Sequence, residues 1–527
     1  MIPSIFNDVI GPVMRGPSSS HSAAAVRIGL IARALMNGEI SRVTAGFDRS
    51  GSLATTHTSQ GSDMGLSGGL LGFGVADERL PDYANQLRRA GIEIEYVIDD
   101  YQDPHPNTYR LSLRNAQERH TLRAVSTGGG MLEVIDIDGC QVSLQGDRHL
   151  LLVYFAGGGG RLAKAVQALR PDAQLTVQTG KARSYILLKS HTPLDRSLAA
   201  SLTRHESVLC VRIIPPVLPV ATPVSVNIPF ANCRQMLAFN RDKQMDLGEL
   251  ALAYESARGA ISRQEVRDKM TGIIQTIRKS IRTGLRGTDY RDRILGCQSV
   301  SFRNHLASGR LMDLGALNTA ILYVTALMEV KSALGVIVAA PTAGSCGGLP
   351  GTLLGAADAM NLDDTKVVNA FLAAGLVGIF IAGSATFAAE VGGCQAECGS
   401  GSGMAAAGLV ELLGGTPEQA LTAAAMALQN SFGMTCDPVA NRVEAPCLGK
   451  NLMSAGNAFA TANVALAGYD AVIPLDETIS AMDAVGKNLP ATLRCTGLGG
   501  LSITPTSRKI EQQLRDRLCQ DRKIQDI

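Results

Sequence analysis

Short runs of β-forming residues, separated by turn residues, dominate the first part of the chain. In four of these runs Val, Ile, Leu, Phe and Tyr alternate with polar residues or cluster together. They occupy residues 42–48, 92–100, 109–115 and 131–139. This pattern predicts strands, and the helix-forming stretch at 23–35 adds a helix. We therefore expect an α/β domain over residues 1–148.

The same pattern recurs on a smaller scale over residues 149–216. Strand-type runs stand at 150–156, 174–180, 184–190 and 208–216, and helix-type spacing at 161–170 and 195–205. The order strand, helix, strand, strand, helix, strand predicts a small ferredoxin-like α+β module. Four prolines within residues 215–225 then predict a semi-rigid linker.

Helical spacing takes over in the rest of the chain, where Ala, Gly, Leu and Met are abundant and β-branched alternation is scarce. We expect a large all-α domain over residues 217–527. One uncharged segment, Ala370 to Ala389, is long enough to cross a bilayer. Its Ala and Gly content, and its lack of Trp, Tyr, Lys or Arg anchors, favour a buried core helix over a membrane span.

Composition and charge narrow the classes of function. The chain has 527 residues, of which 46% are hydrophobic and 18% charged, as in a globular protein with several domains. The net charge of +2 and the aromatic content of 4% argue against a nucleic-acid partner. No basic stretch followed by an apolar one opens the chain, so we predict no secretory signal and a cytoplasmic protein.

The chain has eleven cysteines, which we expect to be free thiols in such a protein. Cys394, Cys436 and Cys447 stand in glycine- or proline-rich breaks between predicted helices, where their side chains can converge. The residues alone leave two interpretations open: a three-thiolate metal site, or packing of small apolar side chains. The spacing is neither that of a zinc ribbon nor that of a bacterial ferredoxin, so it does not decide between them.

A second stretch with chemical potential lies near the N-terminus. Ser18, Ser19 and Ser20 are followed by His21 and then by the helix-forming stretch. Hydroxyls and free backbone N–H groups at a helix start suit a carboxylate ligand. Simple helix capping beside a solvated histidine explains the same residues.

Several motifs, taken in order, resemble a known family. They are GPSSSH with the following Arg-Ile-Gly, GSLATTHTSQGSD, HPNT, the triplet Gly128–Gly130, AAPTAG, EVGGCQAE, TCDPV and APCLGKN. Together they look like the iron–sulfur-dependent L-serine dehydratases (L-serine ammonia-lyases), and the resemblance covers nearly the whole chain. It implies a β domain first and an α-helical domain last, with residues 149–216 similar to the ACT-type module of some members.

The resemblance also implies a cofactor and a mechanism. The family's three cluster ligands fall on Cys394, Cys436 and Cys447, which implies a 4Fe-4S cluster with one iron left open. Such an iron acts as a Lewis acid on the substrate hydroxyl. His21 matches the family's histidine after the serine run and is the expected acid–base group. The implied reaction removes water and then ammonia from a 3-hydroxy amino acid, with L-serine to pyruvate as the first expectation.

The remaining implied residues hold the substrate and support the metal. The substrate-binding residues expected from the matching motifs are Ser18, Ser19, Ser20, Ser52, Asp63, Thr342 and Gly344. Asp437, Arg442 and Lys450 could stand behind the metal ligands. A turn or surface role explains each of these substrate-binding and supporting residues equally well. The expected partner is a small amino-acid substrate, with no nucleic acid and no membrane, and we expect a homodimer.

The chain departs from the family pattern at two positions. Gln60 stands where the family has a histidine, with His57 as a possible substitute, and Ala343 replaces an asparagine. A changed substrate is therefore an alternative: another hydroxy acid, or cysteine in a desulfhydrase, because soft iron suits a thiol leaving group.

Two further alternatives come from other classes. The glycines of Gly157–Gly160 could cradle a phosphate in a pyridoxal-phosphate dehydratase, although no convincing Schiff-base lysine accompanies them. A non-enzymatic iron–sulfur sensor is the other alternative, but the sequence shows no DNA-reading element for its output.

Overall fold

In the computed structural model a six-stranded sheet forms the base of the N-terminal region; the structure describes residues 2–180, 183–223, 225–290 and 292–525, with side chains to residue 517. The strand order is β3-β2-β4-β5-β6-β7, and only β2 and β3 are parallel. The strands are β2 (Arg42–Asp48), β3 (Glu93–Asp99), β4 (Thr108–Arg114), β5 (Arg119–Gly128), β6 (Met131–Ile137) and β7 (Cys140–Leu144). Their alternating burial leaves one face to solvent, as is common in antiparallel sheets.

Two helices cover the buried face of this sheet. These are α1 (Ala24–Leu35) and α3 (Ser62–Leu70), and α2 (Leu53–Thr56) and α4 (Tyr83–Ala90) complete the region. The helices α1 and α3 pack at backbone distance, since a Cβ on Gly29 would lie 2.6 Å from the Leu66 carbonyl oxygen. Glycine is required there by this close approach.

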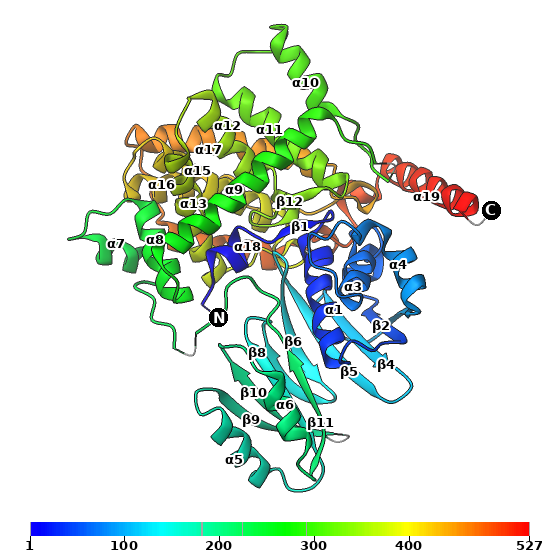
Figure 1. Cartoon of the computed structure of the whole chain (residues 1–527). Helices are drawn as coiled ribbons and strands as arrows, with labels where there is room; N and C mark the ends of the chain where they lie inside the picture. Colours follow the sequence, from blue (N-terminus) through cyan, green and yellow to red (C-terminus); the bar gives the residue numbers. More distant parts are fainter. Residues whose placement is uncertain (1, 181–182, 224, 291, 526–527) are drawn as a thin grey trace.

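A four-stranded antiparallel sheet follows, in the order β11-β8-β10-β9. Its elements are β8 (His149–Phe155), α5 (Gly160–Leu169), β9 (Gln174–Thr179), β10 (Ser184–Ser190), α6 (Arg196–Thr203) and β11 (Val208–Ile214). One face packs on α5 and α6 through Leu162, Val166 and Leu202. The other face joins the core of the first sheet through Leu152 and Tyr154. This unit lies at the lower end of the molecule in Figure 1.

Helices make up nearly all of the C-terminal part. They are α7 (Cys233–Asn240), α8 (Leu247–Gly259), α9 (Arg263–Arg286), α10 (Gln298–Ala307), α11 (Ala316–Ser332), α12 (Gly348–Ala359), α13 (Asp364–Ser384), α14 (Ala389–Gly392), α15 (Ser400–Leu412), α16 (Pro417–Gln429), α17 (Cys447–Leu466), α18 (Leu475–Asn488) and α19 (Pro505–Gln525). The expected division into a mixed α/β N-terminal part and a largely helical C-terminal part is confirmed. Of the expected linker, residue 224 lies outside the described residues.

The helix α13 is at the centre of the helical part, packed against α8 and α15. In the described part of the chain it is the one helix that is long and apolar enough to cross a membrane, and 78% of its most apolar window is buried inside the protein. The side chains from Ala370 to Ile381 are almost all buried. The expected core helix is therefore confirmed for this portion of the segment.

The N-terminal segment ties the first domain to the helical part. A π-helical turn, Ile5–Val9, packs against α13, and Glu255 of α8 accepts hydrogen bonds from Ser4 Oγ and the Ile5 N–H. The strand β1 (Val13–Arg15) then pairs with β12 (Val336–Val338). The pairing of β1 with β12 places the serine run, which follows β1, against the helical part.

A half-buried carboxyl group makes the stability of the helical part pH-dependent. Glu411 of α15 faces the start of α8, where the Leu247 N–H donates to its Oε2 at 3.1 Å. Burial, and then the charge of Asp246, raise the pKa of Glu411 from 4.5 to about 8. The folded protein thus keeps this proton to a higher pH than the unfolded chain does. The resulting stabilisation is full below pH 4.5 and is lost as the pH rises through about 8.

We expect Glu411→Gln to flatten this dependence, because glutamine keeps the acceptor oxygen and cannot ionise. Thermal unfolding of both proteins between about pH 5 and about pH 9 measures the effect. The melting temperature of the wild type should fall more steeply with pH than that of the variant. The exposed Glu418→Gln is the control and should follow the wild type. Parallel pH profiles for wild type and Glu411→Gln would contradict the assignment.

Candidate active site and metal centre

Three of the predicted residues are cysteines that the helical part buries close together. Cys394 follows α14, Cys436 lies in an extended segment, and Cys447 is the first residue of α17. Their exposed fractions are 2%, 5% and 7%. The Sγ atoms of Cys394 and Cys436 and a carboxylate oxygen of Glu397 all lie within 4.8 Å of one another. Cys447 packs in the adjoining cluster with Cys346 and Ala343.

The chemistry of this donor set fits a thiophilic metal. Hydrogen bonding with Cys394 and Cys495 and then burial hold the pKa of Cys436 well above its ordinary value. Burial raises the pKa of Cys447 to about 12. The thiols of Cys436 and Cys447 are thus neutral until a cation replaces their protons, which is how metals bind cysteine. The cysteine group is therefore compatible with a metal cofactor.

A lysine supplies positive charge beside the thiols. Lys450 of α17 donates from Nζ to the Thr435 carbonyl oxygen at 2.5 Å and to Asp437 Oδ1 at 3.0 Å. Burial alone would lower the pKa of Lys450, but negative charge at Cys394 and Cys436, once a cation has replaced their protons, and at Asp437 outweighs burial and raises it. Lys450 therefore stays protonated and would offset the negative charge of metal-bound thiolates. Arg442, in contrast, binds Asp292 at 2.6 Å.

The predicted serine and histidine residues form a π-helical turn, Ser19–Ala23, that leads into α1. His21 is fully buried, with its Nδ1 3.0 Å from Ser18 Oγ and its Nε2 2.8 Å from Thr56 Oγ1. Thr56 uses its own proton for the Ser52 carbonyl oxygen. The network therefore assigns the histidine proton to Nε2 and leaves a lone pair on Nδ1.

A buried glutamate of the helical part faces this histidine. Glu390 of α14 places Oε1 3.5 Å from His21 Nδ1. Burial lowers the pKa of His21 to about 3 and raises that of Glu390. His21 is consequently neutral at physiological pH. Ser20 and Asn107 lie beside the Glu390 carboxyl group and partly offset the effect of burial on its pKa.

Several buried polar atoms around Glu390 make no hydrogen bond of good geometry to any described residue. They are Glu390 Oε2, both amide atoms of Asn107 and Ser126 Oγ. Asn107 precedes β4 and Ser126 lies on β5, and the Ser126 N–H donates to the Asn107 carbonyl oxygen at 3.0 Å. Buried polar atoms rarely lack partners. Their gathering here points to a polar ligand.

The loop with Thr342 and Ala343 closes the site from the helical side. The Ala343 N–H donates to Ser19 Oγ at 3.2 Å, and Thr342 Oγ1 donates to Glu397 at 2.6 Å. Burial raises the pKa of Glu397 to about 7. Gly344 leaves room for this carboxylate, since a Cβ there would lie 3.0 Å from Glu397 Oε1. Glu397 therefore contacts both the loop with the predicted Thr342 and Gly344 and the pair of cysteines, Cys394 and Cys436.

Two other predicted substrate residues have protein partners. Asp63 Oδ1 lies 2.6 Å from His57 Nδ1, and its Oδ2 accepts from Thr58 at 2.8 Å. Ser52 Oγ donates to the Cys495 carbonyl oxygen at 2.9 Å. Gln60 is buried, and its amide contacts the Cys495 thiol. Ser52 and Gln60 therefore join the first domain to the cysteine segment, whereas the contacts of Asp63 stay within the first domain.

The sequence interpretation did not single out Glu390, Glu397, Asn107 or Cys495. Glu390 and Glu397 flank Cys394 within the EVGGCQAE motif, and Asn107 belongs to HPNT. Proximity to a candidate ligand was therefore an available signal for the two glutamates, and membership of a matching motif was the signal for Asn107. Cys495 stands in a segment with no motif that marks it, and only the fold brings it to Cys436.

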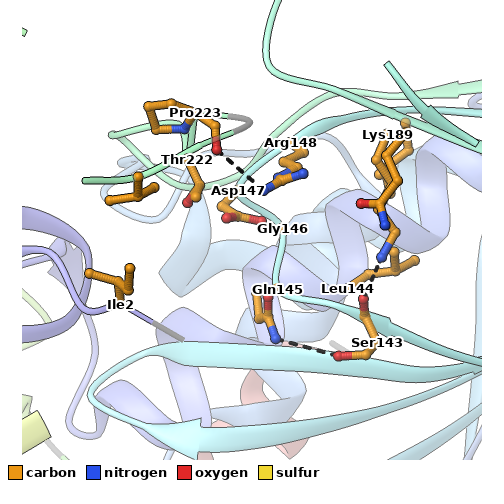
Figure 2. A pocket seen from close by; sticks show the side chains of 13 residues that line it. Ile2, Ser143, Leu144, Gln145, Gly146, Asp147, Arg148, Lys189, Thr222 and Pro223 are labelled. Carbon is orange, nitrogen blue, oxygen red and sulfur yellow. Dashed lines mark hydrogen bonds between the residues drawn. The ribbon is translucent and has the colours of Figure 1, made fainter. Parts of the chain in front are cut away.

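A separate cavity of about 450 Å³ lies between β7, the start of β8 and the segment around Thr222. Figure 2 shows Asp147, Arg148 and Lys189 along its wall. Arg148 and Lys189 donate to the carbonyl oxygens of Pro223 and Ser143 at 3.4 Å and 3.0 Å. None of the predicted site residues lines this cavity, which is distinct from the cysteine site. The glycine run of the pyridoxal-phosphate alternative, Gly157–Gly160, leads into α5 at the lower end of Figure 1. It is therefore also far from α17, the helix that begins with Cys447.

Comparison with known proteins places the chain in a family. A model described as the serine dehydratase alpha chain matches residues 242–502. The probable L-serine dehydratase alpha chain of Bacillus subtilis is 37% identical over 285 residues, which are 54% of this chain and 95% of the relative. The chain belongs to the L-serine dehydratase family. The expected family is thereby confirmed.

Other dehydratase relatives extend the match. The L-serine dehydratase alpha chain of Peptoniphilus asaccharolyticus is 38% identical over 280 residues, which are 53% of this chain and 96% of the relative. The probable L-serine dehydratase beta chain of Bacillus subtilis is 36% identical over 177 residues, or 34% of this chain and 78% of the relative. This single chain therefore resembles both an alpha and a beta chain of the dehydratase family. The interval matched by the alpha-chain model contains Glu390 and all three predicted cysteine ligands.

Proposed function

We propose that the protein is an L-serine dehydratase that converts L-serine to pyruvate and ammonia. One observation carries this proposal: buried thiols, a neutral histidine and unpartnered polar atoms meet where the first domain contacts the helical part. Interfaces between domains are common positions for small-molecule sites. The relatives named L-serine dehydratase supply the substrate.

We propose a 4Fe-4S cluster as the cofactor, held by Cys394, Cys436 and Cys447. The burial of the three thiols, the raised pKa values of Cys436 and Cys447 and the nearby Lys450 support it. When bound, a cluster with three cysteine ligands supplies a Lewis-acidic iron that withdraws electrons from the substrate hydroxyl. Lys450 holds its ammonium beside the ligand segment and Asp437 fixes the lysine.

The unpartnered atoms around Glu390 would bind the charged groups of serine. The Asn107 amide hydrogens and the Ser126 hydroxyl are donors suited to the carboxylate, and Glu390 Oε2 is an acceptor suited to the ammonium group. Ser18, Ser19 and Ser20 border the same space. The fully buried surroundings exclude water and strengthen these contacts.

His21 is the proposed base. Its Nδ1 lone pair takes the Cα proton of serine, the Cβ–O bond breaks, and His21 then gives this proton to the leaving hydroxyl, which departs as water. The product, 2-aminoacrylate, tautomerises to an imine that water hydrolyses to pyruvate and ammonia. The Thr56 contact at Nε2 fixes the tautomer that this step requires. Glu397 lies next to Cys394 and Cys436, where it can position the leaving hydroxyl group of serine.

We also propose the domain division 1–148, 149–216 and 217–527. The strand order β11-β8-β10-β9 with two helices on one face supports a ferredoxin-like, ACT-type identity for the middle module. A cytoplasmic homodimer completes the proposal.

An anaerobic assay of 3-hydroxy and 3-thiol amino acids tests the proposal. Pyruvate should form fastest from L-serine. Faster release of pyruvate and sulfide from L-cysteine would favour the desulfhydrase alternative. A cluster-loaded protein that converts none of these compounds would contradict the proposed function.

The variant Asn107→Leu tests whether Asn107 serves substrate binding and not the stability of the fold. Removing a buried amide that makes no hydrogen bond of good geometry should leave the melting temperature unchanged or higher, because a buried unsatisfied amide costs about 1–3 kcal/mol. The same change should lower kcat/KM for L-serine about tenfold or more, since a contact to the carboxylate is lost. Thermal unfolding and steady-state kinetics measure the two effects. Unchanged kinetics would remove Asn107 from the binding site.

A further inference from the structure

The cavity drawn in Figure 2 has a charged wall that the proposed function does not use. Its volume of about 450 Å³ lies within the range of small-molecule sites. Asp147 and Arg148 line it from the segment between β7 and β8, and Lys189 lines it from the end of β10. One carboxylate and two cations therefore surround a space that has the size of a small metabolite.

Asp147 is buried without a hydrogen-bonding partner for its carboxylate. The residue is 7% exposed, and its side chain makes no hydrogen bond with any residue that the structure describes. Its backbone, in contrast, accepts a hydrogen bond from the Thr222 N–H at 3.4 Å. Burying a carboxylate away from donors is costly. An unpartnered carboxylate at the wall of a cavity points to a ligand with a cationic group.

The two cations of the wall form no ion pair with a carboxylate of the described residues. Arg148 donates to the Pro223 carbonyl oxygen at 3.4 Å, and Lys189 Nζ donates to the Ser143 carbonyl oxygen at 3.0 Å. Burial and then the charge of Arg148 lower the pKa of Lys189, and the charge of Asp147 opposes them. The three charges thus act on one another. An anionic group between the two cations would relieve their repulsion.

The segment that carries Asp147 is fixed before any ligand binds. The Gly146 carbonyl oxygen accepts from the N–H groups of Val217 and Leu218 at 2.7 Å and 3.1 Å. Gly146 has a φ of +75°, and a Cβ there would lie 2.6 Å from Val217 Cγ2. Glycine is required at this position by both the conformation and the close approach. The carboxylate is therefore held at the cavity by a rigid connection to the linker.

We propose that this cavity binds an α-amino dicarboxylate, the class of L-glutamate and L-aspartate. Its ammonium group would pair with Asp147, and its two carboxylates with Arg148 and Lys189. The charges of the wall and of the ligand then match one for one. L-Serine has a single carboxylate and would leave one cation unmatched, so the cavity is not a second substrate site. This inference goes beyond the proposed function and does not depend on the proposed cluster.

A ligand in this cavity would tie the second sheet to the helical part. Arg258 of α8 donates from Nε to the Ile2 carbonyl oxygen at 3.2 Å and from Nη2 to Thr222 Oγ1 at 3.1 Å. Ile2 and Thr222 both line the cavity, so one side of its wall is anchored to the helical part. Lys189 lines it from the second sheet. The bound amino acid should raise the melting temperature, because a ligand that binds only the folded state stabilises it.

Isothermal titration calorimetry with L-glutamate and with L-aspartate, on the anaerobically loaded full chain, tests the inference. The variants Asp147→Asn and Lys189→Met each remove one charge of the wall. Lys164→Met, which changes an exposed lysine of α5, is the matched control. Asn107→Leu reports whether the amino acid binds in the proposed active site instead. Glutarate, which lacks the amino group, tests the pairing with Asp147.

The wild type should bind at least one of the two amino acids saturably, at one site per chain. Asp147→Asn and Lys189→Met should weaken this binding about tenfold or more, since each loses a charge-assisted contact. Without ligand, Asp147→Asn should melt at the wild-type temperature or higher, because an unpartnered buried carboxylate is gone. Lys164→Met and Asn107→Leu should keep the wild-type affinity.

Four results would overturn the inference, and each leaves the proposed function intact. They are no saturable binding of either amino acid, equal affinity in the wild type and Asp147→Asn, binding of glutarate as tight as that of L-glutamate, and loss of binding in Asn107→Leu.

Discussion

Cys436→Ser is expected to abolish both the iron–sulfur absorbance and the conversion of L-serine. Cys436 lies within 4.8 Å of Cys394 Sγ and the Glu397 carboxylate, and its backbone pairs with the segment of Cys495. A serine hydroxyl has nearly the same shape but is a poor ligand for iron, which prefers thiolate. Visible absorption, iron content and pyruvate formation of the anaerobically loaded variant measure the effect.

Cys140→Ser is the matched control for this change. Cys140 is also buried, at 3% exposure, but it lies on β7 with its Sγ near the Arg183 carbonyl oxygen. The control should keep the absorbance and the activity of the wild type. A Cys436→Ser variant that keeps both would show that the metal ligands are assigned wrongly.

His21→Asn is expected to lower kcat about 10²–10⁴-fold while the cluster stays bound, because the variant lacks the proposed base. Asparagine can still contact Thr56 and Ser18, so the turn should remain folded. The cysteines belong to other segments, and the visible absorption should therefore be that of the wild type. Steady-state kinetics of the cluster-loaded variant, with its absorption spectrum, provide the measurement.

His120→Asn tests whether loss of any buried histidine has the same effect. His120 lies on β5, fully buried, with its Nδ1 2.7 Å from Asp138. Its replacement should affect the melting temperature more than kcat. A His21→Asn variant with wild-type kcat would remove His21 from proton transfer and direct attention to Glu397.

The sequence pattern predicts most of the architecture because burial is periodic in both kinds of element. The alternation at 42–48 coincides with β2 (Arg42–Asp48), and the runs after residue 149 give the strand and helix order of the second sheet. Pairing across the sheets depends on contacts between distant residues. The pairing of β1 with β12 is an example that periodicity does not reveal.

The site was predictable where a motif marks it. Cys394 and Cys436 are brought together as expected, and His21 lies beside Glu390 of the helical part. The site also contains residues, such as Cys495, whose local sequence pattern does not indicate which distant residues they will contact. Cys495 reaches Cys436 through a left-handed residue held by Ser52, and no spacing rule encodes that contact.

Iron analysis combined with an L-serine assay on the same anaerobically purified sample tests the central claim most directly. The wild type should contain about four irons per chain and form pyruvate from L-serine, and removal of the iron by a chelator should stop pyruvate formation. Undiminished pyruvate formation by the iron-free protein would contradict the claim that these buried thiols hold the reactive centre.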